Sequence, residues 1–348
     1  MNIAFYRYSL FNRGGDRLSL AYANHLASVG HDVTLYVKEM DTIFTVSPAL
    51  KIKTVPCSGR VGFLYYAFRH NLGHDVVIVD IIHLHFLLSL HNKVIYYAQA
   101  DDVEYYDNSF ARILIDFLYR LHFRGKNPMI SMSQHLTDIF SARYGANNVF
   151  TLKTGIDHTL FYPDAKAELV GLKQDKKAVV FMARGDVYRK GLDVAMGVFE
   201  SIEADIAQGM ELWVCGNHLP QDGFGFIVRN FGVVTDARLR QLLSSADIFF
   251  YPSRHEGFGL FPLEAMACGC VAVTTDAIPY AGNTPSMLVS PVGDQSLLKN
   301  NLARLVSDDD ILKELRVKAF LDASAYDFEE SKIAFEEAVK TTVTGYKL

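Results

Sequence analysis

Short apolar runs alternate along this chain with longer segments in which apolar residues recur at helical spacing. The opening predicts a strand over residues 2–8, a helix that ends near Val29, and a strand over residues 32–37. A strand, a helix and a strand in this order begin a parallel, doubly wound sheet. The loop before the helix contains Gly14 and Gly15 but no GxGxxG, so it indicates either a tight turn or a loop beside a ligand.

The alternation continues to the C-terminus with one interruption. Before it, the pattern predicts strands over residues 75–80, 93–99, 129–133 and 149–154, and helices over residues 61–72, 109–124 and 134–144. A proline and a loss of periodicity then mark a linker from Tyr162 to about Lys177. Beyond it, strands are predicted over residues 178–183, 211–215, 247–253, 270–276 and 286–291, with helices that begin near Gly191, Ala237, Pro262 and Leu297. We therefore predict an α/β protein with two doubly wound, Rossmann-like domains.

Composition narrows the class of protein. Half of the 348 residues are hydrophobic and 21% are charged, which is typical of a packed globular chain. The net charge of −5 argues against a nucleic-acid binder. The four cysteines show neither a CxxC pair nor a metal-ligand spacing, and the chain opens without a signal-peptide pattern, so we expect a cytoplasmic protein. No apolar run reaches the roughly 18 residues of a membrane-spanning helix, so any membrane contact would be peripheral.

Three histidines, His83, His85 and His91, lie in one apolar stretch. Imidazoles can ligate zinc, but no carboxylate or cysteine is arranged with these three at ligand spacing. We therefore expect structural histidines and no metal site.

The stretch from Arg254 to Gly269 carries the strongest chemical signal. It follows the apolar strand over residues 247–253, turns through Gly257 and Gly259, and enters a helix whose predicted first residue is Pro262. A strand, a glycine turn and a helix N-terminus together form an anion site, because free N–H groups and the helix dipole point outward.

Two acids flank this turn, Glu256 in the loop and Glu264 in the predicted first turn of the helix. A carboxylate beside a phosphate site repels the phosphate unless it faces another group, and the hydroxyl groups of a sugar or a ribose are the natural candidates. The alternative for Glu264 is a first-turn acid that only interacts favourably with the helix dipole.

A second motif lies at the end of the strand over residues 178–183. Arg184 follows this strand, and Lys190 stands six residues further on, directly before Gly191. A diphosphate leaving group needs cations that stay protonated, and an Arg/Lys pair at a strand end supplies them. The alternative is ordinary surface charge.

The two acids in their context, EGFGL…LEAMACG, resemble the E-x7-E signature of the retaining glycosyltransferases of family 4. Arg184 to Gly191 is similar to the family's R-x5-KG element, and residues 154–164 resemble its NGID…F-P segment. The resemblance implies a GT-B fold, with an acceptor-binding domain over residues 1–163 and a nucleotide-sugar-binding domain over residues 164–328. The family's last helix returns to the first domain, here from about residue 329 to 348.

The resemblance also implies roles for individual residues. Arg184 and Lys190 would stabilise the departing diphosphate. Glu256 would contact the reacting sugar, and Glu264 would bind the nucleotide ribose. The remaining donor contacts would come from two glycine-containing loops: Gly257, Phe258, Gly259, Leu260, Gly14 and Gly15.

The implied activity is transfer of a sugar, with retention, from a UDP- or GDP-sugar to a glycan or lipid-linked acceptor in cell-surface polysaccharide synthesis. No metal and no other cofactor is implied. Two alternatives stay open, a nucleotide-sugar epimerase of the same fold and a subunit that binds without catalysis.

Acceptor contacts are expected after the strand over residues 93–99. Gln99 stands where many family members have a histidine, and Asp101 and Asp102 follow it. At the carboxyl edge of a parallel sheet these acids either bind an acceptor hydroxyl or cap the next loop, and we expect acceptor contact.

The predicted helix from Phe110 to Lys126 is amphipathic and basic. Its apolar stripe comprises Phe110, Ile113, Leu114, Phe117, Leu118 and Leu121, and its basic residues are Arg112, Arg120, Arg124 and Lys126. Such a helix either lies on an anionic membrane surface or packs its stripe against the sheet, and packing is the commoner arrangement.

Overall fold

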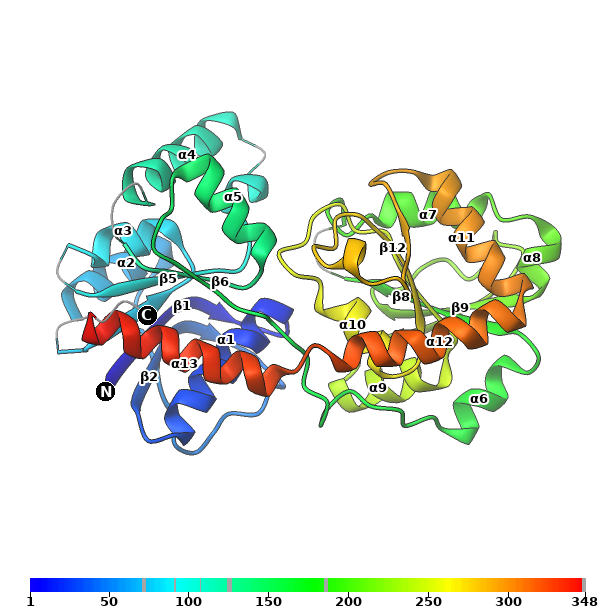
Figure 1. The fold of residues 1–348 in the computed structure, drawn as a ribbon, viewed down its shortest axis with the longest axis horizontal. Helices are drawn as coiled ribbons and strands as arrows, with labels where there is room; N and C mark the ends of the chain where they lie inside the picture. Colours follow the sequence, from blue (N-terminus) through cyan, green and yellow to red (C-terminus); the bar gives the residue numbers. More distant parts are fainter. Residues whose placement is uncertain (71–72, 91, 107, 124–126, 185–186, 346–348) are drawn as a thin grey trace. The chain divides into compact units, whose positions relative to one another are not determined.

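The computed structural model describes residues 1–70, 73–90, 92–106, 108–123, 127–184 and 187–345. The chain forms two compact units, the first of Met1–Thr154 with Glu329–Leu348 and the second of Gly155–Phe328 (Figure 1). The chain therefore passes between the units twice, after Thr154 and before Glu329. Each unit is built around a parallel sheet, as the alternating pattern predicts.

The sheet of the first unit has the order β3-β2-β1-β4-β5-β6-β7, and its neighbouring strands run parallel. The strand order reverses between β1 and β4, and such a switch point leaves a crevice at the carboxyl ends of the two strands. The strands are β1 (Asn2–Leu10), β2 (Asp32–Met40), β3 (Lys51–Thr54), β4 (Val76–Val79), β5 (Val94–Ala98), β6 (Met129–Ser131) and β7 (Val149–Thr151).

Helices cover both faces of this sheet, with α2, α3 and α4 on one face and α1 and α13 on the other (Figure 1). The helices of the first unit are α1 (Gly14–Ser28), α2 (Gly59–His70), α3 (Ile82–Leu88), the 3-10 helix η1 (Asp102–Tyr105), α4 (Ser109–Phe123), α5 (Gln134–Tyr144) and α13 (Phe328–Thr344). In the described part of the whole chain, no helix combines the length and the apolar character that a membrane crossing requires.

Helix α13 completes the core of the first unit from the far end of the chain. The ring of Phe335 is buried and stacks on Tyr22, with ring centroids 4.2 Å apart. The hydroxyl of Tyr22 lies 2.7 Å from Ser331 Oγ, so the same tyrosine is held by both packing and a hydrogen bond. Burial of these aromatic rings is worth several kcal/mol at this scale of area, which fixes α13 on the sheet.

The sheet of the second unit has the order β10-β9-β8-β11-β12-β13, again with parallel neighbours. Its switch point lies between β8 and β11. The strands are β8 (Lys177–Ala183), β9 (Met210–Gly216), β10 (Ile227–Gly232), β11 (Ile248–Tyr251), β12 (Val271–Thr275) and β13 (Leu288–Ser290). The helices are α6 (Ala167–Lys173), α7 (Leu192–Glu200), α8 (Ala204–Gln208), α9 (Asp236–Ser245), α10 (Leu260–Ala267), the 3-10 helix η2 (Ala281–Asn283), α11 (Gln295–Ser307) and α12 (Asp309–Ser324).

The structure contains short elements that the pattern does not predict, namely β3, β10, α3, α6 and α8. Helix α6 lies in the segment predicted as a linker. Helix α3 lies in the continuous apolar run from Val76 to Leu90, where no period distinguishes helix from strand. The elements that the pattern does predict are present in the structure, with ends shifted by a few residues. The predicted ends of two helices, at Leu72 and Arg124, lie outside the described residues.

Helix α4 turns its apolar stripe to solvent. Phe110, Ile113, Leu114, Phe117 and Leu121 recur at helical spacing, and each is between 47% and 76% exposed. The opposite side of the helix packs inward through Ile115, Tyr119, His122 and Phe123. The stripe therefore does not pack against the sheet, and the commoner of the two arrangements expected for this helix is wrong.

Candidate functional site

The loops that follow β8 and β11 are bonded to each other. These strands are neighbours at the switch point, so the chain leaves both at the same edge of the sheet. The backbone N–H of Arg254 donates to the carbonyl oxygen of Arg189 over 2.7 Å, and Ser253 Oγ lies 3.1 Å from the same oxygen. The guanidinium of Arg254 also binds both carboxylate oxygens of Asp193, over 2.6 and 2.7 Å. The two loops therefore form one platform.

Gly191 permits the closest approach in this platform. Its φ is +68°, and a Cβ atom at this position would lie 2.0 Å from the carbonyl oxygen of Pro252. A side chain is excluded by both the backbone conformation and the contact with backbone. The glycine after Lys190 therefore allows the loop after β8 to press against the end of β11.

This approach places Lys190 against Glu256. The ammonium Nζ of Lys190 lies 2.6 Å from Glu256 Oε1. The same oxygen accepts hydrogen bonds from the hydroxyl of Tyr251 over 2.7 Å and from Ser253 Oγ over 2.8 Å. The side chain of Glu256 is only 10% exposed, so these three donors replace hydrogen bonds that it would otherwise make to water. Burial, and then the charge of Glu256, raise the pKa of Tyr251 well above its usual value, so its hydroxyl keeps the proton that it donates.

Arg184 lies directly after β8 and is held beside helix α10. Its guanidinium carbon is 6.0 Å from the ring centroid of Phe261, in the first turn of that helix. The ring of Phe261 in turn meets the ring of Tyr251 edge-on at 6.1 Å, and Lys190 Nζ lies 5.7 Å from the same tyrosine ring. Burial lowers the pKa of Arg184 and the charge of Asp236 opposes this, but a guanidinium stays protonated in proteins. Both predicted cations therefore border one pair of aromatic rings.

Ile278 and Tyr280 contact the glycine turn before α10. Gly259 is the N-cap of α10 with a φ of +90°, and a Cβ atom there would lie 2.8 Å from Ile278 Cδ1. The hydroxyl of Tyr280 donates to the carbonyl oxygen of Gly259, and the ring of buried Phe258 lies 5.1 Å from the ring of Tyr280. These contacts fix residues 257–260, so the N-terminal N–H groups of α10 point from a rigid turn.

The structure corrects two expectations about α10. The helix begins at Leu260, so Pro262 is its third residue and not its first. Proline is still tolerated there, because the N–H groups of the first turn have no intrahelical partner. Glu264 accordingly lies beyond the first turn, and that turn contains no acidic residue. The side chain of Glu264 is 1% exposed. The interpretation of Glu264 as a first-turn acid that only interacts with the helix dipole is therefore wrong.

Gly14, Gly15 and Gln99 lie in the first unit, at the switch point between β1 and β4. The two glycines begin α1, and a Cβ atom on Gly15 would lie 2.1 Å from the side-chain amide of Gln99. In the amide orientation that satisfies both of its ends, Gln99 donates to the carbonyl oxygen of Gly15 over 3.1 Å and accepts from Arg7 Nη1 over 3.0 Å. Gln99 therefore positions the glycine loop from the end of β5.

Sequence reasoning did not single out the charged cluster beneath this loop. Arg7 of β1 forms ion pairs with Asp16 over 2.6 Å and with Asp80 over 2.7 Å. Asp16 is 1% exposed and also accepts from the backbone N–H of Phe11 over 3.0 Å. Burial raises the pKa of Asp80, and the charge of Arg7 opposes this rise. No local motif links Asp80 to the other two residues, because it reaches Arg7 only where β1 and β4 become neighbours.

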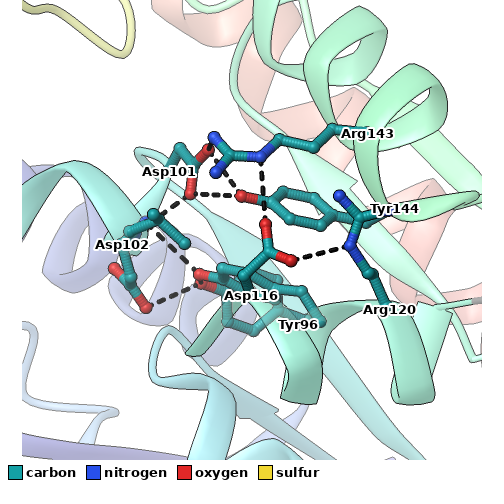
Figure 2. Close-up of polar contacts among 9 residues, drawn as sticks. Tyr96, Asp101, Asp102, Asp116, Arg120, Arg143 and Tyr144 are labelled. Carbon is teal, nitrogen blue, oxygen red and sulfur yellow. Dashed lines mark hydrogen bonds and ion pairs between the residues drawn. The ribbon is translucent and has the colours of Figure 1, made fainter. Parts of the chain in front are cut away.

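Asp101 is occupied by structural contacts (Figure 2). The two oxygens of its carboxylate share the hydroxyl proton of Tyr144, whose Oη lies 2.9 and 2.7 Å from them. It also accepts from Arg143 Nη1 over 3.2 Å and from the N–H of Val103 over 3.0 Å, which makes it the N-cap of η1. The side chain is 2% exposed. These contacts favour the capping alternative for Asp101 over contact with an acceptor.

Asp102 points away from Asp101 toward Tyr96 (Figure 2). The hydroxyl of Tyr96 donates to Asp102 Oδ2 over 3.1 Å, and the hydroxyl of Tyr96 lies 2.7 Å from that of Tyr119. Burial raises the pKa of Asp102 to about 7, because hydrogen bonds from these hydroxyls only partly offset the loss of solvent around the charge. Asp102 is therefore a carboxyl group that titrates near neutral pH.

The histidines of the apolar stretch are placed as structural residues where the structure describes them. His85 is fully buried, its Nε2 lies 3.2 Å from the carbonyl oxygen of Val94, and burial lowers its pKa to about 3. His83 is half-buried in α3, and His91 lies outside the described residues. Over the described ranges, no group of three or more His, Cys, Asp or Glu side chains is arranged to hold a metal ion.

Comparison with known proteins finds a family match in the second unit. A model of the glycosyl transferases group 1 matches residues 176–308, which include Arg184, Lys190, Glu256 and Glu264. The chain is 27% identical over 232 residues to N,N'-diacetylbacillosaminyl-diphospho-undecaprenol alpha-1,3-N-acetylgalactosaminyltransferase of Campylobacter jejuni. This match covers 62% of the chain and 61% of the relative, which is less than two thirds of the relative's length.

Two solved structures share the fold over nearly the whole chain. WaaG, a glycosyltransferase involved in lipopolysaccharide biosynthesis, has a TM-score of 0.79 at 19% identity and covers 99% of this chain and 100% of its own. The Anabaena protein HepE in complex with UDP-glucose has a TM-score of 0.77 at 15% identity and covers 98% of this chain and 100% of its own. The prediction of a GT-B fold is confirmed, and residues 176–308 of the second unit match the glycosyl transferases group 1 family.

Proposed function

We propose that this protein is a retaining glycosyltransferase that moves a hexosyl group from a UDP- or GDP-sugar to a glycan or lipid-linked acceptor in cell-surface polysaccharide synthesis. The observation that carries the proposal is the contact of 2.6 Å between Lys190 and Glu256 at the switch point of the second unit. A cation for a phosphate and a carboxylate for a sugar stand side by side there, next to the N-terminus of α10.

The cations would act on the leaving group. Arg184 and Lys190 would neutralise the charge that develops on the diphosphate as the bond to the anomeric carbon breaks. An ammonium has three N–H donors, so Lys190 can keep its bond to Glu256 and still donate to a phosphate oxygen. The N–H groups at Gly259 and Leu260 would add donors at the helix N-terminus.

The acids would act on the sugar and the nucleoside. Glu256 would face the reacting sugar, where its negative charge stabilises positive charge that grows at the anomeric carbon. Glu264 would bind the ribose hydroxyls. The acceptor oxygen would attack the anomeric carbon from the face that the diphosphate leaves, which retains the anomeric configuration. The released phosphate oxygen would take the proton of the acceptor hydroxyl.

The names of related proteins support this choice of substrates. The Campylobacter relative is named for transfer to a diphospho-undecaprenol acceptor, and HepE was solved with UDP-glucose. An epimerase and a binding-only subunit are less well supported. The chain retains Arg184, Lys190, Glu256 and Glu264, which a subunit that only binds would be free to lose.

A panel of nucleotide sugars tests the proposal. Thermal shift with UDP- and GDP-hexoses should identify a donor, and incubation with that donor and membrane glycolipid extract should release the nucleoside diphosphate. NMR of the product should show the anomeric configuration of the donor. Epimerisation of the free donor without transfer, or a thermal shift without turnover under any acceptor condition, would replace the proposal with one of its alternatives.

A further inference from the structure

One residue of the loop after β11, Arg254, is bonded to the chain on both sides of Lys190. On the N-terminal side of the lysine, the backbone N–H of Arg254 donates to the carbonyl oxygen of Arg189 over 2.7 Å. Its Nη1 donates to the carbonyl oxygen of Tyr188, also over 2.7 Å. On the C-terminal side, its guanidinium binds the two carboxylate oxygens of Asp193 over 2.6 and 2.7 Å. A single residue therefore holds the loop after β8 and the start of α7.

The geometry of Arg254 is itself fixed. Its side chain is 15% exposed, and its guanidinium carbon lies 4.4 Å from the ring centroid of Tyr188. The hydrogen bonds from Arg254 lower the pKa of Asp193, so the carboxylate stays charged at neutral pH. A guanidinium that is bound to both oxygens of a carboxylate and packed on an aromatic ring has a defined plane. Because Asp193 is 59% exposed, this ion pair adds little to stability, and its effect is chiefly geometric.

The contacts of Arg254 also indicate that it does not act on the substrate itself. Three of its side-chain N–H groups are engaged, one by the carbonyl oxygen of Tyr188 and two by the carboxylate of Asp193. A guanidinium whose charge is already paired with a carboxylate is a poor site for a phosphate. Lys190, by contrast, has a flexible side chain that must be held in place to act on a leaving group.

We propose that Arg254 is a positioning residue for glycosyl transfer, which acts through Lys190. With Asp193, it would fix the backbone on both sides of the lysine, so that the ammonium stays beside Glu256 while the donor reacts. Arg254 suits this task because it lies only two residues before Glu256 and so connects the two loops at the point where the cation and the carboxylate meet. The inference rests on the proposed function and assigns a role to two residues outside the Arg/Lys and Glu/Glu pairs.

Steady-state kinetics test the proposal. Arg254→Ala and Asp193→Ala should each lower kcat by about tenfold, because a misplaced cation no longer stabilises the departing diphosphate. The donor KM should change by less than about threefold, since the lost interaction is made mainly in the transition state. If Arg254 bound the phosphate directly, Asp193→Ala would leave turnover normal, and that result would overturn the proposal. Asp193→Ala changes an exposed side chain, so it remains a test if Arg254→Ala does not fold.

Repeating both substitutions in the Lys190→Ala background separates positioning from a general structural role. There, neither Arg254→Ala nor Asp193→Ala should lower kcat further by more than about twofold, because the lysine that they position is absent. Equal losses in the two backgrounds, with a lowered Tm, would indicate a structural role and overturn the proposal.

An ion pair elsewhere in the second unit provides the matched control. Lys299 Nζ lies 2.7 Å from Glu203 Oε1, and the two side chains are 23% and 55% exposed, close to the values for Arg254 and Asp193. Lys299→Ala and Glu203→Ala should leave kcat unchanged. A loss of kcat as large as that of Arg254→Ala would show that the effect is not specific to the Lys190 loop.

Crystal structures of the wild type and of Arg254→Ala without substrate give a readout that does not depend on activity. In the variant, Lys190 Nζ should move out of hydrogen-bond distance of Glu256 Oε1. An unchanged contact would overturn the inference whether or not the protein transfers a sugar. A displaced lysine, in a protein whose wild type turns over no donor, would support the positioning role of Arg254 and overturn only the proposed function.

Discussion

Lys190 and Glu256 are 66 residues apart in sequence, and the ammonium of one lies 2.6 Å from the carboxylate of the other. Each is also held from elsewhere, Glu256 by Tyr251 and Ser253 and the Lys190 loop by its bonds to Arg254. The cation and the carboxylate are therefore already paired in the structure. The predictions below start from the proposed activity at this pair.

Removal of either cation should slow turnover. Arg184→Ala and Lys190→Ala each delete a positive charge that would stabilise the departing diphosphate, so we expect kcat to fall by at least about tenfold in each variant. Steady-state release of nucleoside diphosphate measures this effect. Lys313→Ala on the exposed surface of α12 is the matched control and should turn over normally. Normal turnover in both site variants, with an unchanged Tm, would move the diphosphate site elsewhere.

The contact between Lys190 and Glu256 should make their substitutions non-additive. Once Lys190→Ala has removed the cation, Glu256 loses a direct partner, so adding Glu256→Gln should cost less than it does alone. We expect a coupling energy in kcat/KM of about 1 kcal/mol or more from the double-mutant cycle. The pair Arg184 and Lys313 provides the control cycle and should be additive. Strict additivity of Lys190 and Glu256 would indicate that their contact is absent when donor is bound.

The two acids should fail in different ways. Glu264 is assigned to the ribose, which does not react, so Glu264→Gln should chiefly raise the donor KM. Glu256 is assigned to the reacting sugar, so Glu256→Gln should chiefly lower kcat. Glutamine keeps the shape of each side chain and removes its charge. A loss of Tm in both variants with the same kinetic change would indicate structural roles instead.

Asp102 should make stability depend on pH. Its pKa in the folded protein is about 7, whereas an unfolded aspartate titrates near pH 4. Between these values the folded chain keeps a proton that the unfolded chain loses, so the free energy of unfolding should fall as pH rises from about 4 to about 7. A shift of three units corresponds to roughly 4 kcal/mol, and partial exposure of the side chain reduces it to about half.

Urea unfolding at pH 4.5 and pH 8 measures this effect. Asp102→Asn should be close to the wild type at the lower pH and more stable than it at the higher pH, by about 2 kcal/mol. Asp175→Asn, at an exposed aspartate, should give the same difference at both values. If Asp102→Asn also gives a pH-independent difference, the carboxyl group does not titrate in this range.

Chelation should leave the activity largely unchanged. The proposed chemistry uses Arg184, Lys190 and the N-terminus of α10 for the charge of the diphosphate, so a divalent cation has no required role. Turnover should be the same after EDTA treatment and after addition of Mg²⁺ or Mn²⁺. A loss of activity with EDTA that Mg²⁺ or Mn²⁺ restores would contradict this prediction.

The sequence predicted elements best where capping residues mark both ends. The spacing predicts both ends of the helix Gln134–Tyr144 to the residue, because Ser133 caps its start and Gly145 ends it in the left-handed region. Helix α3 was missed inside an apolar run without a period. The spacing of apolar residues in α4 predicts an apolar stripe. Whether that stripe faces the protein or solvent depends on the neighbouring helices and not on the spacing.

The residues of the candidate site are likewise predictable only in part from the sequence. Arg184, Lys190, Glu256 and Glu264 stand in two short local motifs, so their spacing was visible in the sequence. Tyr251 and Ser253 hold Glu256 only because the chain turns back after β11. The ion pair of Arg7 with Asp80 forms only when β4 takes its place beside β1, and local patterns contain no information on that order.

The burial of Phe335 against Tyr22 has a consequence for synthesis of the protein. The first unit to leave the ribosome needs a helix that is translated near the end of the chain, whereas the second unit is contiguous. The sheet of the first unit therefore lacks α13 on one face until the second unit has been synthesised. A nascent chain arrested before residue 328 should expose the aromatic surface of Tyr22 and Tyr97 to chaperones, and a fragment of residues 1–154 should not fold stably alone.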